Sequence, residues 1–396
     1  MKDILIVANF VSGMDGKDNN RFTYLAKELS MNHNVELVAS NFYHAKKVFR
    51  TGDYSNLPYK VTLLPELGYS KNISFRRFIS HKVFGKNVKK YLSKRKKPDL
   101  IYCAVPSIHA AKFCADYAKK NAVKFIIDIQ DLWPEAFKMV LNIPLISDMI
   151  FEPMKKKANK IYAQADEIVA VSKTYCERAR RENKKNVSIH PVYLGTNLLT
   201  FDENVMKHKN EKEKPIGELW LGYCGTLGSS YDIKCVIDAL SIVEERGYKS
   251  PKFIIMGDGP KKQEFENYAN CKKVNVEFMG RIPYENMCAI LCQCDIVVNP
   301  IVKGSAATII NKHGDYAASG KPLINTQESK EYLELVNEYK MGINCESGNC
   351  LQLAESIIFF LNNEEVAQQM GANARKCAEE RFDRKHTYKE IFELFC

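Results

Sequence analysis

Short apolar runs alternate with longer amphipathic stretches along most of the chain. In the first half the apolar runs, rich in Val and Ile, occupy residues 4–10, 35–40, 99–105, 124–129, 167–172 and 187–193. Apolar side chains at consecutive positions are typical of parallel strands that helices cover on both faces. Residues 21–30 and 107–120, which lie between such runs, place apolar side chains at helical spacing. The pattern predicts βαβ units in a doubly wound parallel sheet.

The same pattern restarts after a polar stretch, residues 196–218, that we interpret as an interdomain linker region. The strands predicted beyond it are residues 219–225, 252–257, 276–280, 295–301 and 321–326. We therefore expect an α/β fold with two Rossmann-like doubly wound parallel-sheet domains, residues 1–195 and 219–381, that face a cleft. A C-terminal helix of about residues 382–396 is expected to pack back on the first domain.

Composition excludes several classes of protein. With 45% hydrophobic and 27% charged residues among 396, the chain has the balance of a soluble globular protein and not of a disordered one. No run of about 18 apolar residues predicts a membrane span, and the N-terminus resembles a buried strand more than a signal peptide. The 13 cysteines are scattered and the eight histidines dispersed, which favours free thiols in a reducing cytoplasm and no metal site.

Positive charge is concentrated in the first half of the chain. The net charge of +11 divides into +16 for residues 1–200, with 34 Lys+Arg and 18 Asp+Glu, and −5 for the remainder. Residues 71–97 hold eleven basic residues and no acid, with apolar residues at helical spacing. Such a helix could have only a solvated basic back, or it could dock on anionic lipid. Nucleic acid is disfavoured because no known nucleic-acid module is visible.

Glycine turns follow several of the predicted strands. They contain Gly13 and Gly16 in the first domain and, in the second, Gly225 with Thr226, then Gly257, Asp258 and Gly259, and lastly Gly280 before Arg281 and Ile282. Each could be only a tight strand-to-helix turn. Three such turns at the strand ends of one domain nevertheless favour a nucleotide site, because glycine lets backbone amides approach a phosphate. No GxGxxG motif opens a helix, so this is not a dinucleotide fingerprint.

Residues 301–326 (IVKGSAATIINKHGDYAASGKPLINT) carry the most informative segment. A helix is predicted from about Asn311 to residue 320, with Lys312 and Asp315 in its first turns. Lys312 could bind phosphate, and Asp315 could accept hydrogen bonds from a ribose diol. Alternatively, these side chains only complement the helix dipole.

These segments together resemble the retaining glycosyltransferases of family 4, which have the GT-B fold, and in particular the bacterial members that build O-antigen, capsule and lipid-linked oligosaccharides. In the first domain the resemblance rests on the Gly-rich loop with Arg21, on IDIQDLWPEAF and on VSKTYCERA. In the second domain it rests on YCGTLG, GDGP, FMGRIP and NKHGDYAASGKP. It covers essentially the whole chain.

The resemblance implies metal-independent transfer, with retention, from a nucleotide-diphosphate sugar to an acceptor held by the first domain. UDP-sugar is the favoured donor, and no cofactor is implied. The implied donor-binding residues are Gly225, Thr226, Gly257, Asp258, Gly259, Arg281, Ile282, Asn311, Lys312 and Asp315. The implied acceptor-binding residues are Gly13, Gly16, Arg21, Trp133 and Glu135, and Asp131 and Lys312 are the candidate catalytic residues. Trp133 could equally serve packing alone.

The chain departs from the family pattern at three places. The first acid of the Glu-x7-Glu motif is replaced by Ala307, and Asp315 stands for the second. Thr226 and Ser230 occupy the positions where many members have Arg and Lys. Lys312, Lys303 or Arg281 would then have to meet the charge of the diphosphate. Asp131 lies where many members have a histidine.

The leading hypothesis is thus a hexosyl- or N-acetylhexosaminyl-type transferase that acts on an undecaprenyl-diphosphate-linked saccharide. It would be cytoplasmic and peripheral to the inner face of the plasma membrane, held there through residues 71–97. Two alternatives remain: a sugar-nucleotide 2-epimerase of the same fold, and a non-catalytic binding subunit of a polysaccharide assembly complex.

Overall fold

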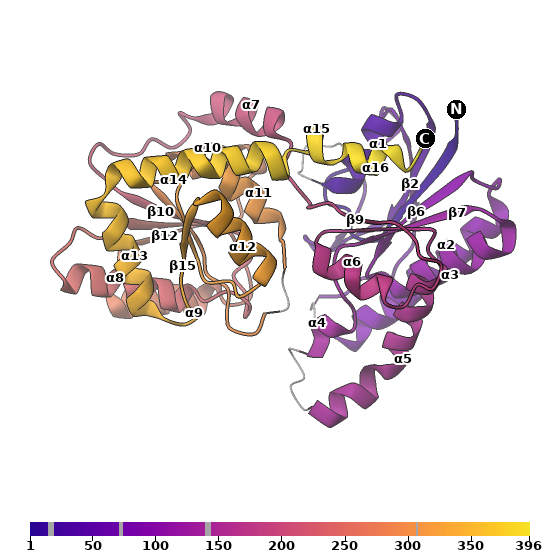
Figure 1. Cartoon of the computed structure of the whole chain (residues 1–396), viewed down its shortest axis with the longest axis horizontal. Helices are drawn as coiled ribbons and strands as arrows, with labels where there is room; N and C mark the ends of the chain where they lie inside the picture. The colour runs from indigo at the N-terminus through magenta and orange to yellow at the C-terminus, as the bar shows by residue number, and fades with distance from the viewer. Residues whose placement is uncertain (15–19, 71–73, 139–143, 306–307) are drawn as a thin grey trace. The chain divides into compact units, whose positions relative to one another are not determined.

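The computed structural model describes residues 1–14, 20–70, 74–138, 144–305 and 308–396. The chain folds into two compact units (Figure 1). The first unit comprises Met1–Val192 and Tyr388–Cys396, and the second comprises Tyr193–Thr387. Each contains a single all-parallel main sheet, which confirms the predicted fold class.

The sheet of the first unit has seven strands in the order β5-β2-β1-β6-β7-β8-β9. The strands are β1 (Asp3–Ala8), β2 (Asn34–Ser40), β5 (Lys60–Leu64), β6 (Leu100–Val105), β7 (Lys124–Ile129), β8 (Glu167–Ala170) and β9 (Ile189–Pro191). A small antiparallel hairpin, β3 (Phe42–Tyr43) and β4 (Val48–Phe49), follows β2. Of the seven strands, only β5 was not predicted from the sequence. It lies at the sheet edge and is only partly buried, so its apolar signal is weak.

Helices cover both faces of this sheet. They are α1 (Arg21–Leu29), α2 (Phe75–Lys94), α3 (Ile108–Asn121), α4 (Glu135–Lys138), α5 (Pro144–Gln164), α6 (Lys173–Arg180) and α16 (Lys389–Glu393). Helix α3 packs between α2 and α5 in one layer, while side chains of α1 and α16 share a buried core with β1, β2 and β6 (Figure 1). The predicted basic helix is thus α2.

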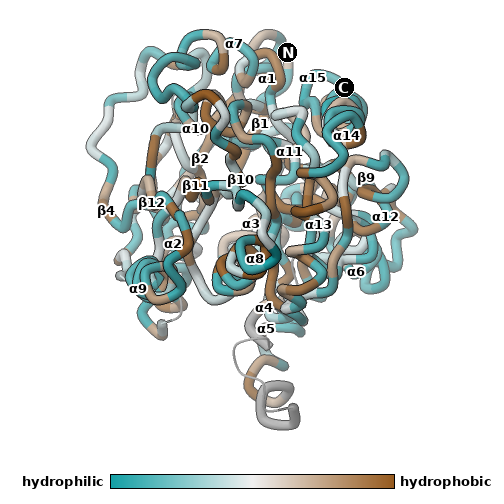
Figure 2. The backbone as a smooth tube through the Cα atoms, turned by 90° about the vertical axis from the view of Figure 1, so that its left-hand side faces the viewer, coloured by the Kyte–Doolittle hydropathy of each residue, from teal (hydrophilic) through white to brown (hydrophobic). Residues whose placement is uncertain are grey.

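The sheet of the second unit has the order β12-β11-β10-β13-β14-β15. Its strands are β10 (Trp220–Cys224), β11 (Lys252–Met256), β12 (Val276–Gly280), β13 (Ile296–Asn299), β14 (Leu323–Asn325) and β15 (Gly342–Asn344). Alternate side chains enter two cores: Trp220 and Cys224 join one, and Leu221 and Tyr223 join the other. Figure 2 shows the hydrophobic segments in the interior and hydrophilic ones along the outer loops and helices.

Two helical layers enclose the second sheet. Helices α8 (Ile233–Glu245), α9 (Lys262–Lys272) and α13 (Cys350–Asn362) contribute to one core. Helices α7 (Leu198–His208), α10 (Tyr284–Gln293), α11 (Asn311–Ala318), α12 (Lys330–Tyr339) and α14 (Glu364–Cys377) contribute to the other. A π-helical turn, η1 (Ala378–Phe382), and α15 (Arg384–Thr387) complete the unit.

The linker prediction for residues 196–218 is wrong over much of its length. Residues Leu198–His208 form α7, whose Leu198 and Phe201 are buried in the second unit beside α10. Several of the charged residues that suggested a linker lie on the exposed face of this helix. The chain leaves the first unit after Val192 and returns to it at Tyr388, later than the expected residue 382.

Candidate functional site

The topology of the second unit directs attention to the carboxyl ends of β10 and β13. Strand order reverses between these neighbours, because the chain proceeds outward from β10 to β12 and then returns to β13 on the other side. Ligands of open α/β sheets bind at such a switch point. The turn after β10 begins at Gly225, and the segment after β13 leads into α11, which carries Lys312.

Lys312 is buried at the start of α11 and points back to the end of β10. Its Nζ lies 3.2 Å from the Tyr223 hydroxyl oxygen, 4.3 Å from the Tyr223 ring centroid and 3.9 Å from that of Tyr231. Burial lowers the pKa of Lys312 to about 8, because the ammonium has lost contact with water. The two aromatic faces offset part of that cost through cation–π attraction. Sequence reasoning found Lys312 but missed both tyrosines.

Gly225 is the residue that lets Lys312 reach this position. Its φ of 139° is rarely adopted by L side chains, and a Cβ atom there would meet the Nζ of Lys312 and lie 2.8 Å from its Cε. The predicted donor residues Gly225 and Lys312 are therefore in direct contact. Thr226, the next residue, is exposed at the same turn.

Gly257 and Gly259 are explained by backbone packing. The Gly225 amide donates to the Met256 carbonyl at 3.0 Å, and the Leu227 amide donates to the Asp258 carbonyl at 3.0 Å. A Cβ at Gly257 would collide with the backbone of Gly225. These glycines hold the turn after β10 against the turn after β11, and the Asp258 carboxylate, exposed, accepts from the Gly259 amide at 2.8 Å.

Asp315 lies one turn after Lys312, and its carboxylate has structural partners that the sequence did not indicate. Its Oδ1 accepts hydrogen bonds from the Thr196 hydroxyl and the Tyr284 hydroxyl, both at 2.8 Å. Asp315 is 7% exposed. The carboxylate thus ties α11 to α10 and to the start of the second unit. Thr196 was assigned to a linker in the sequence, so nothing there indicated this contact.

A buried polar network fixes the approach to α11. His313 Nδ1 accepts from the Ile310 amide at 3.3 Å, and its ring stacks on Tyr332 at 3.5 Å. Its Nε2 lies 3.3 Å from the Asn299 side-chain nitrogen at the end of β13. Burial holds the pKa of His313 well below its ordinary value, so the ring stays neutral and can accept. The network positions the first turn of α11, including Lys312.

The remaining predicted donor residues are more exposed. Asn311, the first residue of α11, and Lys303, which precedes that helix, are both exposed. After β12, Arg281 is exposed and Ile282 is partly buried. Since β11 lies between β12 and β10, Arg281 and Ile282 follow the edge strand and not a strand at the switch point. Ala307 lies outside the described residues.

In the first unit, Asp131 and Trp133 follow the carboxyl end of β7. The Trp133 indole donates to Asp131 Oδ2 at 3.1 Å, and burial raises the pKa of Asp131. Trp133 is 5% exposed, and its ring stacks on His81 of α2 with centroids 5.4 Å apart. The side chain that sequence reasoning proposed as an acceptor contact therefore also belongs to a packed aromatic group.

Two predicted acceptor residues have structural partners instead. Arg21 is 2% exposed, and its Nε pairs with Asp128 Oδ2 at 2.9 Å while Nη1 donates to the Val192 carbonyl. The Arg21 guanidinium also lies 5.0 Å from the Tyr388 ring, so it joins α1 to the returning C-terminal segment. Glu135 accepts from Arg178 at 2.7 Å, which links α4 to α6. We correct the assignment of Arg21, whose buried guanidinium holds elements together, whereas that of the partly buried Glu135 stays a prediction.

The loop after β1 is described only in part. Gly13 is partly buried there, and Arg50 donates to the carbonyls of the two residues before it, Val11 and Ser12. Gly16 lies outside the described residues.

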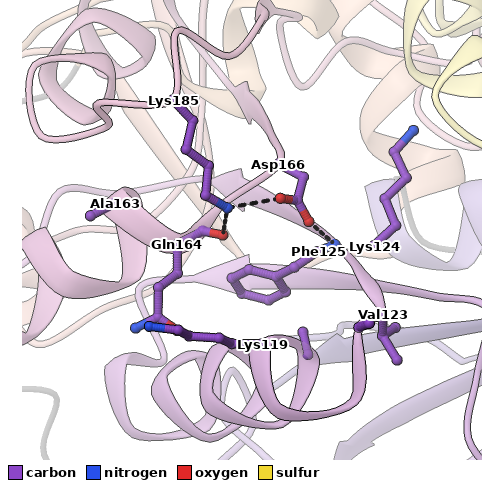
Figure 3. Close-up of a pocket in the computed structure, with 10 residues that line it drawn as sticks. Lys119, Val123, Lys124, Phe125, Ala163, Gln164, Asp166 and Lys185 are labelled. Atoms are coloured by element: carbon purple, nitrogen blue, oxygen red, sulfur yellow. Dashed lines mark hydrogen bonds and ion pairs between the residues drawn. The ribbon is translucent and has the colours of Figure 1, made fainter.

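A separate hollow of about 520 Å³ opens at the opposite, amino-terminal edge of the first sheet (Figure 3). Two of its charged groups pair with each other: Asp166 pairs with Lys185 at 2.9 Å and also accepts from the Phe125 amide at 2.9 Å. Lys124 donates to the Leu394 carbonyl. None of the candidate site residues lines this hollow.

Within ranges 1–14, 20–70, 74–138, 144–305 and 308–396, no group of three or more His, Cys, Asp or Glu side chains could hold a metal ion. Over the same part of the chain, no helix is both long and apolar enough to cross a membrane.

Part of the chain is similar in sequence to one known protein family. Residues 204–377 match the model of the family "Glycosyl transferases group 1". An uncharacterized glycosyltransferase of Methanocaldococcus jannaschii is 22% identical over 236 residues, a region that spans 59% of this chain and 59% of the relative.

Solved structures resemble the whole chain. The HepE protein of Anabaena, in complex with UDP, is 15% identical with a TM-score of 0.71, over 100% of this chain and 99% of that one. Sucrose-phosphate synthase from Thermosynechococcus elongatus is 15% identical with a TM-score of 0.73, over 100% and 98%. The chain therefore has the two-domain GT-B fold, and residues 204–377 of its second unit are similar to the glycosyl transferases group 1 family.

Proposed function

We propose that this protein is a retaining glycosyltransferase that moves a sugar from a UDP-sugar to a lipid-linked, undecaprenyl-diphosphate-bound saccharide in surface polysaccharide synthesis. The observation that carries the donor half of the proposal is the buried Lys312 against Gly225 at the switch point of the second sheet. The group 1 domain match and the UDP complex of the similar HepE structure support it.

The chemical task is to stabilise the diphosphate as it leaves while the sugar becomes oxocarbenium-like. Lys312 provides a positive charge whose aromatic surroundings exclude water, so its attraction to an anion is stronger than in solution. The first-turn amides of α11 and the positive end of its helix dipole both attract an anion. The first turn contains no acidic residue that would repel the diphosphate. Gly225 and Thr226 would line the diphosphate.

Asp315 remains in the proposal as a residue that shapes the donor site. Its carboxylate is held by Thr196 and Tyr284, so we expect it to orient α11 as much as to contact a ribose. In the first unit, Asp131 is proposed to face the reacting sugar, since it lies at the carboxyl end of β7 beside Trp133. Transfer is proposed to need no metal, as the family resemblance implies.

The outer face of α2 is the proposed contact with an anionic membrane. The exposed basic side chains of the helix and the chain after it are Arg76, Lys82, Lys86, Lys89, Lys90, Lys94, Lys96 and Lys97. Phe75 at the start of the helix is 80% exposed and Ile79 is 40% exposed. Each basic residue near anionic lipid contributes about 1 kcal/mol, and the two apolar side chains could enter the interface. This arrangement supports a location peripheral to the inner face of the plasma membrane.

The test is transfer from a panel of UDP- and GDP-sugars to a polyprenyl-diphosphate-linked saccharide on vesicles that contain anionic lipid. We expect transfer from one UDP-sugar, with the anomeric configuration retained by NMR. Incubation of UDP-GlcNAc alone checks the epimerase alternative, since an epimerase needs no acceptor. Absence of transfer and of UDP binding would refute the proposal, and epimerised product without acceptor would replace it.

A further inference from the structure

Tyr231 is an aromatic residue beside the candidate site that the sequence analysis did not single out. It follows the glycine turn that leads from β10 to α8. Its backbone forms an isolated antiparallel bridge with Ile301, and the next amide, that of Asp232, donates to the Pro300 carbonyl at 2.9 Å. Tyr231 is thereby joined to the segment that leaves β13, across the point where the strand order reverses.

The Tyr231 ring is the nearer of two aromatic rings at the ammonium of Lys312. The Nζ atom lies 3.9 Å from the Tyr231 centroid and 4.3 Å from the Tyr223 centroid. The two rings meet edge to face, with their centroids 5.8 Å apart. The Tyr223 hydroxyl accepts a hydrogen bond from Nζ at 3.2 Å and donates one to the Thr226 carbonyl at 2.8 Å. The ammonium therefore lies against both rings at distances that give cation–π attraction.

The two tyrosines differ in how much of the second unit depends on them. Tyr223 is a fully buried residue of β10, and its side chain belongs to the core between the sheet and α8. Tyr231 is only partly buried and packs at the margin of that core. The contact of Tyr231 with Lys312 can therefore be removed with less damage to the packing of the unit than the contact of Tyr223.

Several titratable groups surround Lys312, on β10, after the glycine turn and on α11 itself. They are Tyr223, Cys224, Tyr231, His313, Asp315 and Tyr316. Burial raises the pKa of Cys224 to about 12 and raises the pKa of each of the three tyrosines above its ordinary value. Burial holds the pKa of His313 well below its ordinary value, and the Asp315 carboxylate accepts from two hydroxyls. The charge of Lys312, whose pKa burial lowers to about 8, is therefore expected to change between pH 7 and 10 while Cys224 and His313 stay neutral.

We propose that Tyr231 is a positioning residue of the donor site, whose ring holds the ammonium of Lys312 where the diphosphate of the donor meets it. The inference rests on the proposed function, because it assigns Tyr231 to the group that receives the leaving diphosphate. An aromatic face attracts the charged form of Lys312 and not the neutral amine, so the ring keeps this side chain charged to a higher pH. Only the charged form attracts a phosphate strongly. Tyr231 therefore widens the pH range over which the donor binds.

The experiment measures the affinity of the full chain for UDP by isothermal titration calorimetry at pH 7 and pH 9. Loss of the ring in Tyr231→Leu should lower the pKa of Lys312 by about one unit, because a desolvated cation–π contact changes such an equilibrium about tenfold. Tyr231→Leu should therefore bind UDP up to about tenfold more weakly than the wild type at pH 9, with a smaller difference at pH 7. Tyr231→Phe keeps the ring and should match the wild type at both pH values. Titration of UDP itself cancels, since the proteins are compared at the same pH.

Tyr248→Leu is the matched control, since Tyr248 is a tyrosine of the same unit that is 37% exposed. Its affinity for UDP should equal that of the wild type at both pH values. An affinity of Tyr231→Leu that is unchanged, or reduced equally at pH 7 and pH 9, would overturn this inference alone, because a merely structural role has no such pH dependence. Failure of the wild type to bind UDP would instead refute the proposed function.

Urea unfolding tests the same contact without a ligand, and so applies even if Tyr231→Leu binds UDP too weakly to measure. At pH 7, Lys312→Met should raise the unfolding midpoint more in the Tyr231→Leu background than in the wild type, because the ring offsets part of the cost of burying the ammonium. At pH 10, where Lys312 is largely neutral in the folded chain, the two increases should be equal. Equal increases at pH 7 as well would overturn the inference.

Discussion

Replacement of Lys312 by Met should change the stability of the second unit and its proposed UDP binding in opposite directions. Lys312→Met keeps the length of an unbranched side chain and removes a buried charge. The Tyr223 hydroxyl, which now contacts Lys312, still donates to the Thr226 carbonyl at 2.8 Å, so that hydroxyl keeps a hydrogen bond. We therefore expect the variant to be more stable than the wild type near neutral pH and to lose affinity for UDP.

The magnitude follows from the pKa of Lys312, which falls from 10.5 to about 8 on folding. At about 1.4 kcal/mol per unit, holding the side chain charged in the folded state costs about 3 kcal/mol. Cation–π attraction to Tyr223 and Tyr231 offsets about 1–2 kcal/mol. The net expectation is that Lys312→Met gains about 1–2 kcal/mol in the free energy of unfolding at pH 7.

The dependence on pH gives the sharper test. Below pH 8 Lys312 is charged in both the folded and the unfolded state, and the full penalty stands. Between pH 8 and 10.5 the unfolded chain binds more protons than the folded one, so the stability contributed by this group rises with pH. The advantage of Lys312→Met over the wild type should therefore shrink across that window.

Urea unfolding of both proteins at pH 7, 8, 9 and 10 measures this difference, and a thermal shift with UDP measures binding. Lys330→Met, at a side chain that is 89% exposed on α12, is the control and should change stability by less than about 0.5 kcal/mol at every pH. A variant that is less stable than the wild type, by the same amount at pH 7 and pH 10, would refute the electrostatic reasoning. Unchanged UDP affinity would remove Lys312 from the donor site.

Three further outcomes are expected. Arg21→Met should lower the free energy of unfolding by about 3–5 kcal/mol, because it leaves Asp128 charged and buried, and a loss below 1 kcal/mol in urea would contradict this. Gly257→Ala should destabilise the second unit by more than about 2 kcal/mol, since its Cβ meets the Gly225 backbone. Gly304→Ala is the control: its Cβ would meet nothing within 4 Å, so only the positive φ of Gly304 should destabilise that variant, and by less. EDTA should leave transfer unchanged, and a loss that Mg²⁺ restores would show a metal requirement.

The amino-acid pattern determined the fold class because it depends on local periodicity. Most of the predicted strands in the two sheets are buried apolar runs, which are typical of parallel strands that helices cover on both faces. The strands that were missed, β5 and β15, lie at sheet edges and are half-buried, so they lack that pattern. Helix α7 was missed because charged side chains on its exposed face obscured Leu198 and Phe201.

The sequence by itself also predicted that Gly225 and Lys312 lie together, since they follow strands that a parallel sheet brings to one edge. Only the tertiary structure decided what each charged side chain does there. Arg21 and Asp315 have their partners 107 and 119 positions away, at Asp128 and Thr196, and Lys312 lies against a ring 81 positions earlier, at Tyr231. Periodicity fixes which residues are buried, whereas the partner of a buried charge depends on how distant segments meet.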